Sequence, residues 1–396
     1  MKPLIWCEID CARLQANLAR FRRLVGPDCL LAPTVKANAY GHGGVLAATA
    51  FCAAGADWLT VNSLPEAREL RQAGIGVPLY VMGYVAQEDL AEAVALDCRL
   101  VVYDEQRVDA LGRLVPRLPP GCRARLHLKI ETGNNRQGLD LPAARALARR
   151  IAATPGLVLE GAATHFADIE DTTDHTYARQ QLARFRTAIA ELRGDGHPVP
   201  VCHCANTAAT ILWPESYLAL VRVGIGAYGM WPSVQTQVAA VLEGRPDVIT
   251  LEPALTWKTR IAQLKDVPAG EFVGYGRTFR TTHPTRLAVL PVGYYDGYDR
   301  RLSNLAYVLV RGQRAPLRGR VCMNMCMVDV TDVPGVTVEE EAILLGGQGA
   351  ERLSAEQLAE WTGTINYEVT TRIPAHVPRL PVGVSARPSG SLEESQ

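Results

Sequence analysis

Residues 32–43, which read APTVKANAYGHG, combine a lone lysine with the surroundings that imine chemistry needs. Lys36 follows a β-prone apolar stretch that includes Leu31 and Val35, and a turn-prone, glycine-rich segment with Tyr40 comes after it. Burial at the end of a strand lowers the pKa of a lysine, so that its free amine can form a Schiff base near neutral pH. The segment therefore predicts a lysine of covalent catalysis; the alternative is an ordinary solvated lysine.

Two further segments carry side chains suited to an anionic substrate. Arg136 lies with Lys129 in residues 127–138, HLKIETGNNRQG. Because a guanidinium clamps a carboxylate through two hydrogen bonds, Arg136 predicts a carboxylate partner. His165 follows the expected strand Leu157–Ala162 and would face the mouth of a barrel. Taken singly, these residues are equally consistent with a strand lysine, a loop arginine and a core histidine.

Glycine-flanked tyrosines mark the C-terminal part of the chain. Tyr275 lies between two glycines in VGYGRTF, and Tyr294 follows a glycine in LPVGYYDG. Met323 lies in a later segment, GRVCMNMCM. A tyrosine, with a pKa of about 10, becomes an efficient base when neighbouring cations lower that pKa. A glycine-flanked tyrosine in a hairpin is the alternative.

The elements that must position these residues alternate along the first 240 or so residues. Short apolar runs and amphipathic stretches predict eight βα units, the pattern of a (β/α)8 TIM-type barrel. A doubly wound sheet is the alternative. The expected strands are Leu30–Val35, Trp58–Val61, Pro78–Met82, Leu100–Val102, Ala124–Ile130, Leu157–Ala162, Val199–Cys202 and Ala219–Val223. The expected helices are Asp10–Leu24, Gly44–Ala54, Leu64–Ala73, Glu88–Ala95, Asp104–Leu114, Leu141–Ala153 and Thr176–Arg193.

The composition changes near residue 240, where Trp-Pro-Ser and Glu-Gly-Arg-Pro-Asp interrupt the alternation. Beyond this point β-branched runs are separated by Gly and Pro. We therefore predict a barrel domain over residues 1–243 and a mostly-β domain over residues 244–386, with a short helix at Ser354–Thr362. The polar residues 387–396 are predicted to be a disordered tail.

Composition limits the partners and the location. The chain has 396 residues, of which 48% are hydrophobic, enough for two domain cores. Lys+Arg and Asp+Glu both number 41, so there is no electrostatic reason to expect nucleic acid or a membrane as a partner. No apolar run approaches the roughly 18 residues of a membrane span, and no secretion signal opens the chain. We expect a soluble, cytoplasmic protein.

The ten cysteines, none in a C-x-x-C pair, predict reduced and mostly buried thiols. Cys202, His203 and Cys204 are adjacent and could be considered as metal ligands. Neighbouring residues of a strand point to opposite faces, however, so they cannot easily share an ion. We therefore expect no metal site.

Taken in order over about residues 5–380, these motifs resemble the alanine racemases, pyridoxal-phosphate enzymes with a barrel domain and a β domain. The resemblance implies pyridoxal 5′-phosphate as the cofactor, bound by the barrel domain. It implies that the chain interconverts L- and D-alanine, for cell-wall precursors or for catabolism.

The resemblance also implies two bases on opposite faces of the substrate, as racemisation requires. Lys36 would hold the cofactor and abstract the proton of the D-substrate. Tyr275, supplied by the partner subunit, would abstract the proton of the L-substrate. The chain is therefore expected to be a homodimer with shared active sites.

Around the cofactor, the resemblance places Arg222 of the segment VRVGIGAYG at the pyridine nitrogen. An arginine there leaves this nitrogen largely unprotonated, which limits the lifetime of a carbanion and hence transamination. Backbone N–H groups of Gly224 and Ile225 would meet the phosphate, as loops after the last barrel strands commonly do. The other implied cofactor-binding residues are Tyr40, His165, Asn206 and Thr207.

For the substrate, the resemblance implies that Arg136 and the backbone N–H of Met323 meet the carboxylate and that Tyr294 acts as a gate. His165 would link Arg136 to the tyrosine base. Lys129 matches a lysine that is often carbamylated in the family, which would give an anion that fixes Arg136.

Three departures from the family pattern bear on substrate choice. Asn134 and Asn135 replace the usual Met-Gly, Asn324 follows Met323 where aspartate is common, and Ala375 stands where a tyrosine normally walls the pocket. The lost ring leaves room, and the amides could bond a hydroxyl. A serine or broad-specificity amino-acid racemase is therefore an alternative to an alanine racemase.

Two alternatives belong to other classes. A non-catalytic pyridoxal-phosphate-binding barrel protein would keep the lysine but lack the β domain that holds Tyr275. A decarboxylase of the same architecture would usually carry an acidic residue in place of Arg222.

Overall fold

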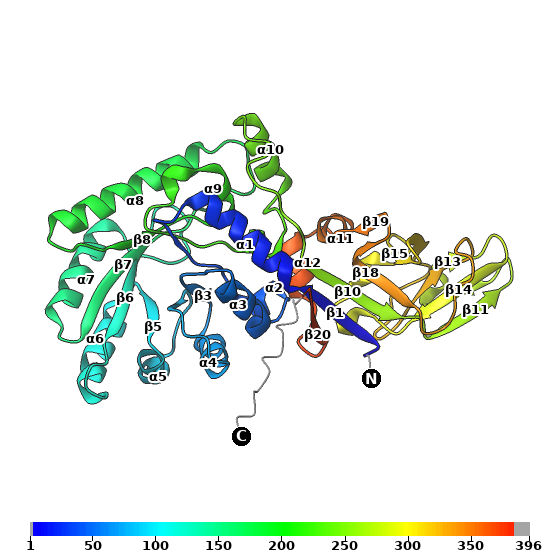
Figure 1. The fold of residues 1–396 in the computed structure, drawn as a ribbon, viewed down its shortest axis with the longest axis horizontal. Helices are drawn as coiled ribbons and strands as arrows, with labels where there is room; N and C mark the ends of the chain where they lie inside the picture. Colours follow the sequence, from blue (N-terminus) through cyan, green and yellow to red (C-terminus); the bar gives the residue numbers. More distant parts are fainter. Residues whose placement is uncertain (1–2, 384–396) are drawn as a thin grey trace, which may run out of the picture.

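The computed structural model describes residues 3–383, so the expected tail at residues 387–396 lies outside the described residues. Figure 1 shows two parts side by side, a barrel with helices around it and an elongated β domain.

Parallel strands form the barrel. Strands β3 to β8 make a six-stranded sheet in chain order, and β2 pairs with β9. Backbone hydrogen bonds from Val35 to Thr60 (2.8 Å) and from Arg222 to Ala205 (3.0 Å) join the two sheets into a ring. The strands are β2 (Leu30–Leu31), β3 (Leu59–Val61), β4 (Leu79–Val81), β5 (Cys98–Val102), β6 (Ala124–Lys129), β7 (Leu157–Ala163), β8 (Val201–His203) and β9 (Leu220–Val221).

Helices between the strands cover the outside of this ring (Figure 1). Leu79 and Val81 of β4 belong to the main core under the helices, whereas Tyr80 packs with Trp58 and Val101 in a separate interior cluster, because successive strand residues face opposite sides. The helices are α1 (Cys11–Val25), α2 (Lys36–Tyr40), α3 (Gly44–Ala53), α4 (Leu64–Gln72), α5 (Leu90–Ala95), α6 (Glu105–Leu114), α7 (Leu141–Ala153), α8 (Thr176–Gly194), α9 (Thr207–Leu212) and α10 (Val234–Leu242).

The C-terminal part is built from antiparallel sheets. Its largest sheet has the order β16-β15-β18-β10-β1-β20, with β19 paired to β18, and β11-β14-β17 form a second sheet. The strands are β10 (Leu255–Arg260), β11 (Gln263–Val267), β12 (Phe272–Val273), β13 (Phe279–Arg280), β14 (Thr285–Leu290), β15 (Tyr307–Val310), β16 (Gln313–Pro316), β17 (Cys326–Asp329), β18 (Glu341–Gln348), β19 (Glu351–Leu353) and β20 (Arg379–Val382). Its helices are α11 (Ala355–Thr362) and α12 (Asn366–Thr371).

The first strand joins the two parts. β1 (Ile5–Asp10) pairs antiparallel with β10 and parallel with β20, so it lies in the C-terminal sheet although it precedes the barrel in the chain. Asp10 then caps α1 by accepting a hydrogen bond from the Arg13 backbone N–H. The expected barrel domain, residues 1–243, thus begins with a strand of the other domain's sheet.

The expected fold class is confirmed: a (β/α)8 barrel is followed by a mostly-β domain. The helix expected at Ser354–Thr362 is α11, with Ser354 as its cap. The short helices α2, α9, α10 and α12 were not expected, because short helices give a weak periodic signal.

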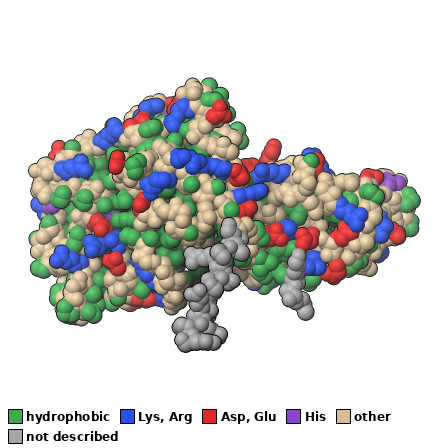
Figure 2. All heavy atoms as spheres, in the orientation of Figure 1, with side chains coloured by type: hydrophobic (Ala, Val, Ile, Leu, Met, Phe, Trp, Pro, Cys, Tyr) green, Lys and Arg blue, Asp and Glu red, His purple; other side chains and the backbone are tan. Residues whose placement is uncertain are grey.

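Several composition-based expectations concern thiols, metals and membranes. All ten cysteines, which lie within the described residues, are free. Within residues 3–383 no group of three or more His, Cys, Asp or Glu side chains could hold a metal ion. None of the helices there is long and apolar enough to cross a membrane. Figure 2 shows acidic and basic side chains interspersed over both parts on the face in view.

Buried Asn17 of α1 fixes the segment that leads into the β domain. Its side chain donates to the Glu252 carbonyl (2.8 Å) and accepts from the Glu252 backbone N–H (3.1 Å). Asn17→Ala removes the partner of both the Glu252 backbone N–H and the Glu252 carbonyl, and we expect it to lower the free energy of unfolding by about 1–3 kcal/mol in urea titrations. Arg23→Ala, an exposed change on the same helix, is the control; equal losses in both variants would contradict this role for Asn17.

Candidate active site

Lys36 opens an unusual turn at the mouth of the barrel. The four residues after it, Ala37 to Tyr40, have φ of 54°, 53°, 53° and 52°, so the chain makes a turn of left-handed helix without a glycine. This conformation costs roughly 1–2 kcal/mol per residue. Surrounding contacts must therefore stabilise it, and its effect is to bring Lys36 and Tyr40 to the same cavity.

Hydrogen bonds from three directions hold this left-handed turn. Glu66, at the start of α4, accepts from the Ala37 backbone N–H (2.7 Å). The Asn38 side chain accepts from the Gly44 backbone N–H (2.9 Å). From the β domain, Arg379 Nε donates to the Gly41 carbonyl (2.8 Å). The turn is thus fixed by both domains.

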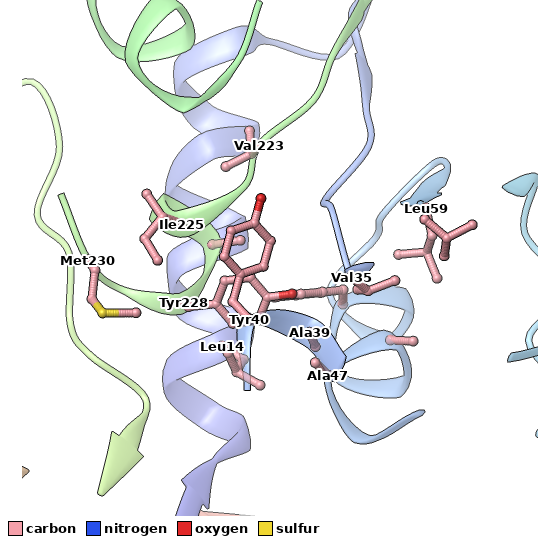
Figure 3. Packing of buried hydrophobic residues seen from close by; sticks show 14 of the residues in the cluster. Leu14, Val35, Ala39, Tyr40, Ala47, Leu59, Val223, Ile225, Tyr228 and Met230 are labelled. Carbon is pink, nitrogen blue, oxygen red and sulfur yellow. The ribbon is translucent and has the colours of Figure 1, made fainter. Parts of the chain in front are cut away.

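Aromatic packing sets the position of Tyr40. Its ring centroid lies 5.1 Å from that of Tyr228 and 5.9 Å from that of Tyr367, and Figure 3 shows Tyr40 and Tyr228 side by side. Gly41, the next residue, is tightly enclosed: a Cβ there would lie 2.0 Å from the Thr370 carbonyl oxygen, so no larger residue fits. Helix α12, which holds Tyr367 and Thr370, therefore packs directly against the turn.

A cavity of ≈ 350 Å³ lies beside this turn. All eight residues expected to bind the cofactor line it, together with six that were not expected. The expected ones are Lys36, Tyr40, His165, Asn206, Thr207, Arg222, Gly224 and Ile225. The others are Thr34, Ala37, Met82, Glu170, Tyr367 and Thr371.

Positive charge dominates the electrostatics of the cavity. Burial, with the charges of Arg136 and Arg222, lowers the pKa of the Lys36 amine. Burial likewise lowers the pKa of Lys129, to about 7, and Arg222 and Arg136 contribute. The pKa of His165 falls well below its usual value for the same reasons, so this imidazole is neutral. A buried amine without its proton is the form that imine chemistry and proton abstraction require.

Glu170 and Tyr367 are the lining residues that sequence reasoning missed. Glu170 accepts hydrogen bonds from Asn206 Nδ2 (2.6 Å) and from the Tyr367 hydroxyl (2.9 Å), and burial raises its pKa. Glu170 lies in a loop five residues after His165, and Tyr367 comes from the β domain. Only packing between distant segments joins them, so no local pattern could have found them.

The region around α9 offers hydrogen-bonding groups to the cavity. Asn206 caps α9 by accepting from the Ala209 backbone N–H (3.0 Å). The Thr207 hydroxyl accepts from the Gly224 backbone N–H (2.9 Å). A Cβ at Gly224 would lie 2.6 Å from the Tyr40 hydroxyl, so glycine is needed for that hydroxyl to reach this end of the cavity.

Arg136 and its two neighbours lie outside this cavity. Arg136 is exposed and acts on the lysines through its charge. Asn134 Nδ2 donates to the Phe166 carbonyl (3.4 Å), and Asn135 has a φ of 53°. Asparagine tolerates this left-handed conformation better than most residues, which explains how it can replace a glycine here.

The residues expected from the β domain do not reach the Lys36 cavity within one chain. Tyr275, Met323 and Tyr294 are 73%, 55% and 44% exposed. The loops of the last two are joined by a hydrogen bond from the Tyr294 backbone N–H to the Cys322 carbonyl (3.0 Å). Strand β13, just after Tyr275, lies far from the barrel in Figure 1.

The two β-domain residues that differ from the family pattern, Asn324 and Ala375, are also at the surface. Asn324 is exposed next to Met323, and exposed Ala375 is not among the residues that line the cavity. His376 stacks on Tyr295, with centroids 4.9 Å apart, and its Nε2 lies 3.4 Å from Asp296 Oδ1. His376 is thus held by Tyr295 and Asp296 and does not line the Lys36 cavity.

The mouth of the barrel holds a partly buried lysine among cations, and the barrel is joined to a mostly antiparallel β domain. This combination of fold and site defines a class of enzymes with a barrel domain and a β domain. Comparison with known families identifies it. Models described as "Alanine racemase, N-terminal domain" and "Alanine racemase, C-terminal domain" match residues 9–232 and 254–381. The chain belongs to the alanine racemase family and is an isomerase of that family.

Similar proteins match over nearly their whole length. An alanine racemase of Desulforamulus reducens is 41% identical over 97% of this chain and 100% of its own. One of Desulfovibrio desulfuricans is 39% identical over 95% of this chain and 97% of its own. A crystal structure of alanine racemase from Bacillus anthracis with bound L-Ala-P has a TM-score of 0.88 at 33% identity, covering 98% of this chain and 97% of that one.

The lowered pKa of Lys129 predicts a pH-dependent stability. Its pKa is about 7 in the folded chain against 10.5 as the ordinary value. Between about pH 7 and 10 the unfolded chain therefore binds more protons, and the cost of burying Lys129 falls as pH rises. Lys129→Met should raise the free energy of unfolding more at pH 7 than near pH 10, in urea titrations with CO₂-free buffer.

Arg23→Met serves as the control, because Arg23 is exposed on α1 and a guanidinium keeps its charge at both pH values. Its effect on the free energy of unfolding should be the same at both pH values. A Lys129→Met effect that is equally independent of pH would contradict the lowered pKa.

Proposed function

We propose that this chain interconverts L- and D-alanine with pyridoxal 5′-phosphate as cofactor. The observation that carries the proposal is the Lys36 cavity, in which a desolvated lysine, Arg222 and a set of hydrogen-bonding groups converge. The names of the relatives support alanine as substrate, and one solved relative is described with bound L-Ala-P.

The residues present fit this cofactor. Lys36 would hold it by its amine, and the cations around the cavity suit a phosphate anion. Thr207, the Tyr40 hydroxyl and the backbone at Gly224 and Ile225 would bind the phosphate end, where the enclosed Gly224 admits no side chain. When bound, pyridoxal phosphate withdraws electrons from the substrate and acidifies its α-proton.

The chain's own residues would then move this proton. The Lys36 Nζ, whose pKa is lowered by burial, takes the α-proton from one face of the substrate, and the Tyr275 Oη serves the opposite face. Arg222 would face the pyridine nitrogen as a cation. Because a guanidinium does not release its proton in this pH range, the nitrogen would stay largely unprotonated. Arg136 and the Met323 backbone N–H bind the carboxylate, and Tyr294 gates the entrance.

Because Tyr275 is exposed and outside the Lys36 cavity, we propose a homodimer in which each chain completes the site of its partner. A hollow of ≈ 650 Å³ beside Tyr275 supports this arrangement. Its lining combines charged residues, Lys265, Asp266 and Glu271, with apolar ones. Half-exposed Phe272 and Met325 are among the apolar side chains and suit contact with a second chain.

Lys129 is a candidate for carbamylation. At its pKa of about 7 much of the amine is neutral, and a neutral amine adds to CO₂ to form a carbamate and release a proton. The product is an anion in a cation-rich region, where it would pair with Arg136. The proposal also includes a cytoplasmic location and D-alanine supply for cell-wall precursors; the ten free thiols support the first.

Serine remains the second candidate substrate. Exposed Ala375 cannot fill the space of a tyrosine ring, and a lost contact of this kind changes selectivity by about 1–3 kcal/mol. The two readings from other classes are less well supported. A non-catalytic cofactor-binding barrel would not need the β domain, and Arg222 in the cavity differs from the acidic residue expected of a decarboxylase.

Removing the proposed cofactor lysine gives the simplest test. Lys36→Ala should lose the visible absorbance band of lysine-bound pyridoxal phosphate and racemase activity together. Lys265→Ala, which removes an exposed lysine, should keep the band. If the band persists in Lys36→Ala and disappears in Lys129→Ala, the lysine assignment is wrong.

Mixing two inactive variants tests the shared site. In a dimer of Lys36→Ala and Tyr275→Phe chains, one site contains both changes and the other has intact Lys36 and Tyr275. Co-refolding the two variants should therefore restore up to about a quarter of wild-type activity, since half of the dimers are mixed and each has one intact site. No recovery, with mixed dimers verified by mass, would place both bases in one chain.

A further inference from the structure

Four side chains form a continuous hydrogen-bonded chain inside the barrel, which we call the Glu160–Arg222 relay. Glu160 Oε2 lies 3.2 Å from His127 Nε2, and His127 Nδ1 lies 2.8 Å from His203 Nε2. His203 Nδ1 is hydrogen-bonded to Arg222 Nη1. Arg222 lines the Lys36 cavity, so the relay connects that cavity to a carboxylate on β7.

The chemistry of its ends fixes the direction of every bond in the relay. A guanidinium only donates, so His203 Nδ1 must accept from Arg222. His203 then carries its proton on Nε2 and donates it to His127 Nδ1. His127 in turn carries its proton on Nε2 and donates to the Glu160 carboxylate. Each imidazole is neutral and has one possible tautomer.

The electrostatic surroundings agree with this arrangement. Both histidines are completely buried, and burial lowers the pKa of each imidazole, with the Arg222 charge adding to the effect. Burial raises the pKa of Glu160, but the hydrogen bond from His127 and the charges of Arg99 and Arg125 outweigh it and keep the carboxylate ionised.

The backbone is shaped for these contacts. Leu126 pairs with Leu159 and His127 with Gly161, so Glu160 is an extra residue in β7, a bulge that turns its side chain towards His127. A Cβ at Gly161 would lie 2.7 Å from His127 Nδ1, so only glycine leaves room for the ring. Bulges that redirect a side chain are typical of strands near active sites.

We propose that Glu160 is a positioning residue that acts through His127 and His203 to hold Arg222 in one orientation at the cofactor. The backbone also holds Arg222, because its Nη2 donates to the Thr164 (3.0 Å) and Cys204 (3.2 Å) carbonyls. The relay thus sets which N–H groups of Arg222 remain for the cavity. Its existence is independent of the proposed function, whereas its effect on the cofactor rests on that function.

The first test of the relay is the tautomeric state of its two histidines. In the full chain labelled with ¹⁵N-histidine, without and with added pyridoxal phosphate, His127 and His203 should both show a proton on Nε2 only, from about pH 6 to 9. A proton on Nδ1 of His203, or a mixture of tautomers at either ring, would overturn the proposal. This readout needs neither cofactor nor activity, so it stands apart from the racemase assignment.

Substitutions at Glu160 test the effect on Arg222. Glu160→Ala removes the last acceptor, and we expect mixed tautomers and about tenfold weaker binding of pyridoxal phosphate in fluorescence titrations. Glu160→Gln should restore both, because its amide oxygen again accepts a hydrogen bond from the His127 Nε2–H. Glu92→Ala, which removes the exposed partner of Arg68, is the matched control.

If Glu160→Ala equals Glu92→Ala in tautomers and in cofactor affinity, Glu160 has no positioning role. If Glu160→Gln fails to restore the single tautomers, the direction of the relay is wrong. If the wild-type chain has the predicted tautomers but binds no pyridoxal phosphate, the relay holds and the proposed function fails.

Discussion

The structure concentrates positive charge where burial limits its solvation, and the site depends on this constraint. Lys36, Lys129 and Arg222 are withdrawn from solvent, Arg136 adds its charge from the entrance, and Glu170 is the one carboxylate among the described residues that line the cavity. Unpaired buried charge is costly, so burial lowers the pKa of both lysines and the cavity favours an anionic ligand. Both consequences suit an amine that works on a phosphate-bearing cofactor.

The backbone accepts strain to assemble these groups, and distant segments hold it in place. The left-handed turn after Lys36 is fixed by Glu66 from the barrel and by Arg379 from the β domain. Tyr367 of α12 and Tyr228 enclose Tyr40. Strand β1 lies in the C-terminal sheet and leads into the barrel, so it also joins the two domains that hold the turn. The β domain therefore supports the Lys36 cavity of its own chain, in addition to the role proposed for Tyr275 in a partner.

Sequence patterns predicted the elements that repeat and the residues that lie in motifs. They missed the contacts that form only when distant segments pack together. The alternation of strands and helices predicted the barrel, and the family resemblance pointed to eight residues that line one cavity. The left-handed turn was missed because Ala37 to Tyr40 contain no glycine to signal it. Glu170 was missed because its hydrogen bond with Tyr367 of α12 forms only when the two distant segments pack together. The position of His127 between Leu126 and Leu128 did hold a signal, since alternation places it inside the barrel.

The most direct test of the account is α-proton exchange in deuterated buffer, with the full chain, pyridoxal phosphate and L-alanine or L-serine, while the chirality is followed. The account predicts that L-alanine gives D-alanine with deuterium at Cα, while recovered L-alanine keeps its proton early in the reaction, because two bases serve the two faces. The same result with serine at a similar rate would extend the substrate range. Cofactor binding without exchange of alanine would contradict the account.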